Sequence, residues 1–499
     1  MPPAFRHVPA LLVLAAFAAC GGSGGDGGGH NNPPGPTGLS TGPANCVNGM
    51  AGDFNCTGLN LRKRVPFSTL GGSAGNDIWG WSDSVTGKEY ALVGMTNGTA
   101  FVDVSDPERP VALGRLPTAT SASAWRDIKV YGDYAYVVAD GAGNHGMQVF
   151  DLRRLRGVTA SMTFTADALY SGFGNAHNIA INEDSGFAYV VGSNMCNGGL
   201  YMIDLNSPAS PVFAGCHDLT DTHDTQCVIY HGPDAAYVDR EICFSSNENH
   251  VEIVDVTDKS TTLSLAMLVY PDTGFVHQGW LSEDHSHFYV GDELDELQIN
   301  IPTRTVVLDV SDLDAPAYLS SYQSTTASTD HNLYVRGNRI YEANYSSGLR
   351  ILQVDDAAAD KLSEIAYFDA YPQSNAAGFD GAWSVYPYLP SGTLIVNDQD
   401  NGLFVLTMDT STPFATAVAT AFEGDTIDLE GVVAGPPVTT TWVQTGGTPA
   451  SITSPAALST TATLPNLAAD EWLSFDLVVE DGSNNRPVDT VYVRVQVNP

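Results

Sequence analysis

Basic residues are scarce in this chain. Its 499 residues include 21 Lys and Arg against 57 Asp and Glu, which gives a formal net charge of −36 at pH 7. Such a surface repels phosphate backbones, so nucleic acid is not an expected partner. Solubility in salty surroundings explains the acidic surface, and binding of cations is the alternative that stays open.

Long apolar runs and paired cysteine motifs are also missing. Nothing after the N-terminal stretch is long or apolar enough to span a bilayer. The sequence has no Cys-x-x-Cys pair, which argues against a thiolate metal site. A hydrophobic content of 43% is nevertheless ample for a packed core.

The N-terminus predicts export. Arg6 and His7 precede an apolar run that ends at Cys20, and glycines and serine follow. A basic start, a short apolar stretch and small residues are typical of a signal peptide, here over residues 1–20. A flexible Gly/Ser/Pro-rich linker is expected over residues 21–43.

The residues around Cys20 resemble a bacterial lipobox, in which the cysteine is acylated. A spacer after it suits a tethered domain, so we expect Cys20 to anchor the protein in the bacterial cell envelope, at the outer membrane or cell surface. Phe17 stands where a lipobox usually has leucine, which leaves ordinary cleavage and a secreted or periplasmic protein as the alternative.

Six cysteines remain after Cys20, an even number that suggests disulfides in an exported protein. They fall into couples that are close in sequence. We predict the pairs Cys46 with Cys56, Cys196 with Cys216, and Cys227 with Cys243.

A glycine-led apolar strand recurs along the chain and ends in an aspartate or another polar residue. Copies include Gly98-Thr-Ala-Phe-Val-Asp103, Gly199-Leu-Tyr-Met-Ile-Asp204 and Gly402-Leu-Phe-Val-Leu-Thr407, and the ends of seven copies lie 44 to 54 positions apart. A period near fifty made of strands is typical of a β-propeller with one four-stranded blade per repeat. We predict an all-β chain with a seven-bladed β-propeller over residues 44–411.

The last repeat lacks a fourth strand. We expect a strand from the N-terminal side, Val65-Pro-Phe-Ser-Thr-Leu70, to complete it and so remove the open edge. Residues 413–499 show several short alternating runs around Trp442, which predicts a small immunoglobulin-like β-sandwich. The aspartates that end the repeats, as in Asp103-Val-Ser-Asp-Pro107, are expected to be turn residues.

The repeats resemble the LVIVD repeat, and the stretch from Leu61 to Leu406 resembles the choice-of-anchor B family of surface proteins. Supporting runs include Thr222-His-Asp-Thr-Gln-Cys227, Asp330-His-Asn-Leu-Tyr334 and Gly381-Ala-Trp-Ser384. The resemblance implies a propeller on the cell surface, attached by varying devices, without an established activity. Residues 413–499 look like the PKD-like and cadherin-like modules of bacterial surface proteins.

Polar residues from every repeat occupy one equivalent position at the start of the innermost strand. The starts of the innermost strands should line the channel of the propeller and form a ring at its mouth. The residues at this position are Asn76, Arg126, His177, His223, His277, His331 and Asp380.

This ring allows three interpretations. The four histidines could hold a transition metal such as Zn, Fe or Mn, or serve as a general acid/base site with Arg126 binding an anionic group. The third interpretation is structural, because a repeat duplicates residues that join neighbouring blades. The acidic loop Asp292-Glu-Leu-Asp-Glu296 is a weaker Ca²⁺ candidate, and His285 and His287 are expected to face solvent.

The sequence therefore favours an exported binding protein rather than an enzyme, with a protein, a glycan or a small molecule as ligand. A metal-dependent hydrolase or lyase that uses the histidine ring is the alternative. An adhesive function of residues 413–499 also stays open.

Overall fold

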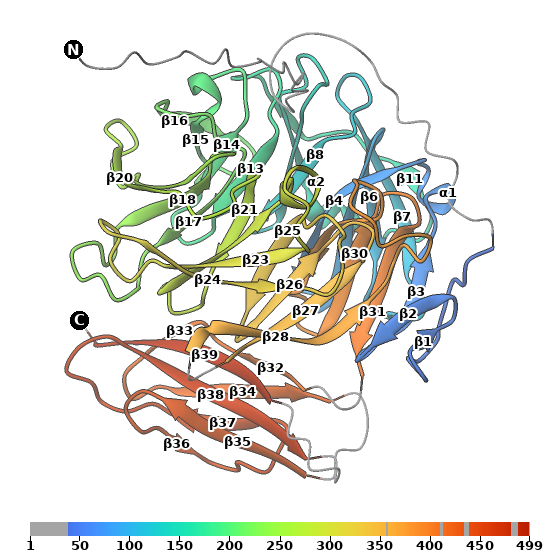
Figure 1. Cartoon of the computed structure of the whole chain (residues 1–499). Coiled ribbons are helices and arrows are strands. Elements are labelled where there is room, and N and C mark those ends of the chain that lie inside the picture. Colours follow the sequence, from blue (N-terminus) through green and yellow to red (C-terminus); the bar gives the residue numbers. More distant parts are fainter. Residues whose placement is uncertain (1–37, 356–357, 410–412, 434–438, 481–487, 499) are drawn as a thin grey trace, which may run out of the picture. The chain divides into compact units, whose positions relative to one another are not determined.

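The computed structural model describes residues 38–355, 358–409, 413–433, 439–480 and 488–498 (Figure 1). The predicted signal peptide, Cys20 and residues 21–37 of the linker lie outside the described residues. In the part of the chain that is described, no helix has both the length and the apolar character needed to cross a membrane.

Antiparallel sheets with one common strand order make up the described residues before 410. Each contains four strands paired in the order first, second, third and fourth, with the first strand at one edge of the sheet. The first strands are β4 (Gly75–Asp83), β8 (Arg126–Tyr131), β13 (Asn178–Asn182), β17 (Asp224–Ile229), β21 (Val276–Leu281), β25 (Asn332–Arg336) and β29 (Ala382–Tyr386). The second strands are β5 (Lys88–Met95), β9 (Tyr134–Ala139), β14 (Phe187–Val191), β18 (Glu241–Ser246), β22 (His287–Asp292), β26 (Arg339–Ala343) and β30 (Thr393–Asp398).

The glycine-led segments of the sequence form the third strands. These are β6 (Gly98–Asp103), β10 (Met147–Asp151), β15 (Leu200–Asp204), β19 (Val251–Asp255), β23 (Arg304–Asp309), β27 (Leu349–Asp355) and β31 (Gly402–Met408). The fourth strands are β7 (Val111–Pro117), β12 (Ala168–Tyr170), β16 (Val212–His217), β20 (Leu263–Leu268), β24 (Ala317–Gln323), β28 (Ala358–Phe368) and β3 (Leu59–Val65). Two sheets are extended, one by β11 (Met162–Thr163) and one by β1 (Met50–Ala51) and β2 (Phe54–Thr57).

The first strands of successive sheets contact one another in chain order, and β29 contacts β4. The first strands therefore follow each other around a closed ring, with the other strands outside it (Figure 1). This is an all-β protein of many four-stranded antiparallel sheets, consistent with a β-propeller.

The N-terminal strand that completes the last sheet is β3, which pairs with β31 through partners such as Leu61 and Leu406. The prediction that an N-terminal strand completes the last sheet is confirmed, but the predicted segment, residues 65–70, is wrong. Pro66 has no N–H to donate to a ladder, and Phe67–Leu70 form the short helix α1, which ends at Gly71 in the left-handed conformation.

The aspartates at the ends of the third strands are turn residues, as predicted. In each of four sheets the side chain accepts the backbone N–H two residues further along, which is an Asx turn. The four pairs, with N···O distances, are Asp103 and Ser105 (3.1 Å), Asp204 and Asn206 (2.7 Å), Asp255 and Thr257 (2.9 Å), and Asp309 and Ser311 (2.8 Å).

Close packing against the fourth strand explains why the repeat has a glycine at the start of its third strand. A Cβ at Gly402 would collide with the carbonyl oxygen of Val65 in β3, and one at Gly348 would collide with that of Phe368 in β28. Both glycines also have positive φ, at 102° and 76°. Only glycine lets the third strand start this close to the fourth.

All three predicted disulfides are present: Cys46–Cys56, Cys196–Cys216 and Cys227–Cys243. Cys227 and Cys243 lie directly opposite each other on β17 and β18. Disulfides persist in oxidising compartments, so they indicate an extracytoplasmic protein.

The described residues after 412 form two further four-stranded sheets. One contains β32 (Phe414–Ala417), β34 (Thr426–Val432), β37 (Thr460–Thr463) and β36 (Ser451–Ile452); the other contains β33 (Thr420–Phe422), β39 (Val488–Gln496), β38 (Glu471–Glu480) and β35 (Thr439–Gly446). Trp442, Leu473, Phe475 and Val493 are buried in their shared core.

Gly402→Ala is expected to lower the free energy of unfolding by about 3 kcal/mol, because the methyl group overpacks the contact with β3 and is strained at positive φ. Gly132→Ala is the matched control, since Gly132 has a φ of 55° but open space around its Cβ position, and should cost about 1 kcal/mol. Urea unfolding of the disulfide-bonded protein measures both. Equal costs would contradict the packing explanation.

Candidate functional site in the central channel

The ring of first strands encloses a pocket of about 380 Å³, which we call the channel pocket. Every first strand contributes to its lining, as expected for a cavity on the axis of the ring. The contributing residues, in chain order, include Trp79, Lys129, Ala180, Gln226, Gln278, Tyr334 and Tyr386.

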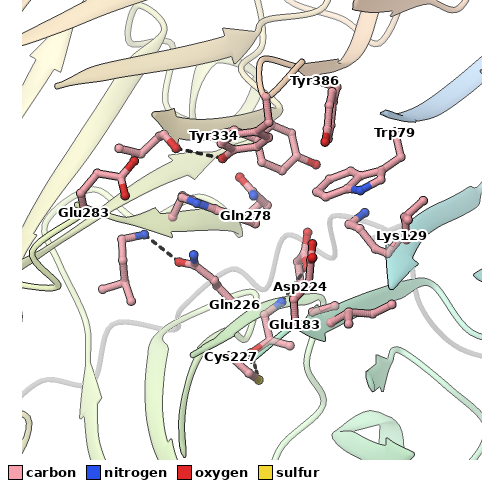
Figure 2. A pocket seen from close by; sticks show the side chains of 18 of the residues that line it. Trp79, Lys129, Glu183, Asp224, Gln226, Cys227, Gln278, Glu283, Tyr334 and Tyr386 are labelled. Atoms are coloured by element: carbon pink, nitrogen blue, oxygen red, sulfur yellow. Dashed lines mark hydrogen bonds between the residues drawn. The ribbon is translucent and has the colours of Figure 1, made fainter. Parts of the chain in front are cut away.

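Aromatic rings and amides face the channel pocket. Figure 2 shows Trp79, Tyr334 and Tyr386 along one side, with Gln226 and Asp224 opposite. The Trp79 ring centroid lies 5.0 Å from that of Tyr386 and 5.6 Å from that of Tyr334. Such edge-to-face contacts hold the rings in fixed orientations.

Hydrogen bonds to the backbone also fix the side chains of Gln226 and Gln278 in the channel pocket. Gln226 accepts the N–H of Leu281 at 2.7 Å, and Gln278 accepts the N–H of Leu333 at 3.0 Å, each through its Oε1. With the oxygen engaged by the backbone, the amide NH₂ of each is the group available to a ligand.

The cation of the channel pocket is already paired. Lys129 Nζ lies 2.6 Å from Asp127, 3.6 Å from Asp77 and 4.6 Å above the Trp79 ring. Burial opposes the charge on Lys129, but the two carboxylates raise its pKa well above the ordinary value. Burial, followed by the charge of Asp127, raises the pKa of Asp224 to about 7. The pocket therefore offers protonatable carboxyls rather than a free cation.

The residue after the ring position joins neighbouring sheets in several repeats. Asp77 accepts the N–H of Ile128 at 3.0 Å, and Asp127 accepts the N–H of Ile179 at 2.7 Å. Each bond runs from one first strand to the backbone of the next. In these repeats the second position is structural.

At the end of the channel where the first strands begin, the four predicted histidines lie side by side. Adjacent ring centroids are 4.4 Å apart for His177 and His223, 4.4 Å for His223 and His277, and 4.3 Å for His277 and His331. We call these four residues the histidine arc.

Backbone carbonyls and one carboxylate orient the histidine arc. The Nδ1 of His223 lies 3.0 Å from the carbonyl oxygen of His277, and that of His331 lies 2.6 Å from that of Trp383, in each case on the next sheet. A carbonyl can only accept, so Nδ1 carries the proton and Nε2 keeps its lone pair. The Nδ1 of His177 instead contacts Asp140 at 3.2 Å.

The arc divides into one basic imidazole and three weakly basic ones. Burial works against a charge on His177, but Asp140 outweighs it and raises its pKa. Burial and neighbouring rings hold the pKa of His223 and His277 well below the ordinary value, and burial lowers that of His331 to about 3. Neutral imidazole is the form that ligates metals.

Glu293 completes this end of the channel, although the sequence placed it in the acidic loop of residues 292–296 and not beside the histidines. Its carboxylate oxygens lie 3.9 Å from Nε2 of His277 and 3.9 Å from Nε2 of His331, and it accepts the hydroxyl of Tyr345 at 2.8 Å. Burial raises its pKa to about 7. Hairpin pairing was the available signal, because the end of β22 lies opposite the start of β21.

The other members of the predicted ring have different surroundings. Asn76 donates to the carbonyl oxygen of Ala124 at 3.0 Å. Arg126 is buried, donates to the carbonyl oxygen of Met95 at 3.1 Å and lies 3.2 Å from Nε2 of His145. Asp380 is half-buried before β29.

His285 corrects one expectation. It does not face open solvent but lines the channel pocket, half-buried, and its Nδ1 accepts the N–H of His231 at 3.1 Å. Burial lowers the pKa of His285 to about 3, so a neutral imidazole lines the channel pocket here.

Comparison with known proteins identifies LVIVD repeats at residues 81–118, 123–144 and 173–218. The chain thus contains an LVIVD-repeat, β-propeller-like domain. No curated protein matches the chain at a significant level.

Among solved structures, the chain is similar to a protein from Lactobacillus plantarum, with 14% identity, a TM-score of 0.45 and coverage of 67% of this chain and 92% of that one. It is also similar to PorZ, a bacterial surface component of the type-IX secretion system of Porphyromonas gingivalis, with 14% identity, a TM-score of 0.44 and coverage of 82% and 58%. The periplasmic gluconolactonase PpgL of Pseudomonas aeruginosa matches with 13% identity, a TM-score of 0.39 and coverage of 57% and 86%.

Lys129→Met is expected to lower the free energy of unfolding by about 3–5 kcal/mol, because it leaves Asp77 and Asp127 buried without their cation. Lys88→Met is the matched control. Lys88 Nζ also lies 2.6 Å from a carboxylate, Asp103, but its side chain is exposed, so the loss should be about 0–1 kcal/mol. Denaturant unfolding compares the two, and similar losses would refute the role assigned to burial.

Proposed function

We propose that this protein is an exported, cell-surface β-propeller that binds a glycan end or a small saccharide in its channel pocket. The observation that carries the proposal is the pocket itself, to which every first strand contributes a side chain. Its volume of about 380 Å³ falls within the range of about 300–1,000 Å³ typical of small-molecule sites.

The chemistry of the lining favours a neutral, hydroxyl-rich ring. Flat faces of Trp79 and Trp280 suit the C–H faces of a sugar, and the amides of Gln226 and Gln278 suit its hydroxyls. Lys129 is neutralised by Asp127 and Asp77, so an anionic ligand would meet no free cation. The overall charge of −36 also disfavours an anion.

The proposed architecture has seven blades and an appended immunoglobulin-like sandwich. Support for the blade count comes from the ring of first strands and from β3, which completes the last sheet. The two sheets after residue 412 and the buried Trp442 support the sandwich.

The proposed location is the outer membrane or cell surface, with Cys20 as lipid anchor and the chain as a choice-of-anchor B protein. The three disulfides support export. The LVIVD repeats and the lipobox-like residues before Gly21 support the family and the anchor.

Trp280→Ala is expected to weaken saccharide binding at least tenfold, because it removes one stacking face from the channel pocket. Trp280 is half-buried and makes an edge-to-face contact with Tyr334, with ring centroids 4.9 Å apart, so the fold should tolerate its loss. Trp125→Ala, at an exposed tryptophan away from the pocket, is the matched control. A glycan array on the purified protein, followed by calorimetry with each hit, measures the effect.

No glycan hit, or hits that both variants retain equally, would reject the saccharide site. Binding of an anionic glycan alone would contradict the argument from Lys129.

A metal-dependent hydrolase or lyase at the histidine arc is the second candidate function. The observation that favours it is that ligand atoms of His277, Glu293 and His331 all lie within 4.8 Å of one another. Two imidazoles and a carboxylate leave coordination positions open for water and substrate, as catalytic zinc sites do.

Untagged protein dialysed against Zn²⁺ is expected to retain one ion per chain, measured by elemental analysis, if this second candidate is right. Glu293→Gln and His277→Ala should lose it, whereas His250→Asn, at a histidine away from the arc, should keep it. Wild-type protein that retains no zinc, iron or manganese would leave the histidine arc as a link between sheets.

A further inference from the structure

A second group of acidic side chains lies next to the histidine arc but is built differently. Asp295 and Glu296 begin the short helix α2 (Asp295–Gln298) between β22 and β23, and Asp330 precedes β25 on the next sheet. One carboxylate oxygen from each of the three lies within 4.8 Å of the other two. We call these three residues the buried acidic cluster.

The carboxylates are withdrawn from water. The relative exposures of Asp295, Glu296 and Asp330 are 0%, 5% and 4%. Ionised carboxylates are almost never buried this far unless a cation or several hydrogen bonds compensate them.

Hydrogen bonds do not compensate Asp330. Neither of its carboxylate oxygens has a hydrogen-bond partner among the described residues, and Oδ1 of Asp295 lacks one as well. By contrast, the turn aspartates Asp309 and Asp255 each accept a backbone N–H. Asp330 is therefore a buried acid that points its oxygens at two other acids and at no donor.

Nearby cations do not compensate the cluster either. Arg304 is shared between two acids, because its Nε donates to Asp295 and its Nη2 lies 3.3 Å from a carboxylate oxygen of Asp292. Asp292 is further satisfied by the N–H groups of Gly274 and Phe275. One guanidinium thus serves Asp292 and Asp295, and within the described residues Glu296 and Asp330 form no ion pair with a basic side chain.

The distances fit one divalent cation with oxygen ligands. Two oxygens bound to the same Ca²⁺ at about 2.3–2.6 Å lie no more than about 5 Å apart, which the spacing of 4.8 Å or less satisfies. Three carboxylates, without nitrogen or sulfur, are hard ligands that favour Ca²⁺ over Zn²⁺.

We infer that Asp295, Glu296 and Asp330 bind one Ca²⁺ that joins the sheet β21–β24 to the sheet β25–β28. The ion supplies the positive charge that Arg304 alone does not. It also fixes the connection after β22, which carries Glu293 two residues before Asp295.

Calorimetric titration of CaCl₂ into the untagged, EDTA-treated full chain tests the inference. We expect one site per chain in the wild type and a Kd at least 100-fold higher in Asp330→Asn. Asp312→Asn is the matched control, because Asp312 belongs to an exposed acidic group with Asp234 and Asp314 and should leave Ca²⁺ binding unchanged.

Thermal unfolding supplies a second measurement, in which Ca²⁺ should reverse the order of the unfolding temperatures of wild type and variant. In EDTA, Asp330→Asn should unfold at a higher temperature than the wild type, because it removes an uncompensated buried charge. In millimolar Ca²⁺ the order should reverse, because only the wild type gains stability from the ion.

The inference is overturned if the wild type shows neither heat nor a rise in unfolding temperature with Ca²⁺, or if Asp330→Asn binds Ca²⁺ as the wild type does. If Asp330→Asn does not fold, Glu296→Gln replaces it in the same comparison. Zinc retention and saccharide binding use other residues, so the outcome for Ca²⁺ by itself decides neither candidate function.

Discussion

The hydrogen bonds between neighbouring first strands are the constraint on which the rest of this structure depends. A first strand has a ladder partner on only one side, so backbone groups on its channel side need other partners. Asp77, Asp127 and Gln278 supply them, each from the preceding sheet. Because these bonds join defined positions, they fix the height of the joined first strands relative to one another along the axis.

That common height gives the channel two ends with different chemistry. At one end the histidine arc and Glu293 bring together weakly basic imidazoles and a carboxyl group. At the other, aromatic rings and amides surround the channel pocket. Lys129, Asp127 and Asp77 lie in the belt of inter-sheet bonds and neutralise one another, so the lysine does not act as a free charge in the channel pocket.

The repeat period was enough to predict the strand order and the convergence of the four histidines, because both follow from register, and closeness in sequence was enough to predict the disulfides. Register could not predict what connections between strands do. Glu293 directly follows a second strand, His285 lines the channel pocket, and residues 67–70 form a helix after Pro66 instead of a strand. Arg126 shares the ring position but reaches His145, because a long side chain is directed by its partners rather than by its register alone.

Composition alone also could not distinguish the roles of the acidic residues. Their hydrogen bonds do distinguish them. Asp103 and Asp309 accept backbone N–H groups, so their carboxylates stabilise turns and need no ion. Asp127 is buried but faces Lys129. Asp330 is buried with neither a donor nor a cation, and its oxygens face Asp295 and Glu296. Since a buried charge must be compensated, the lack of partners at Asp330 is the feature that marks a ligand site, whereas the overall acidity of the chain does not.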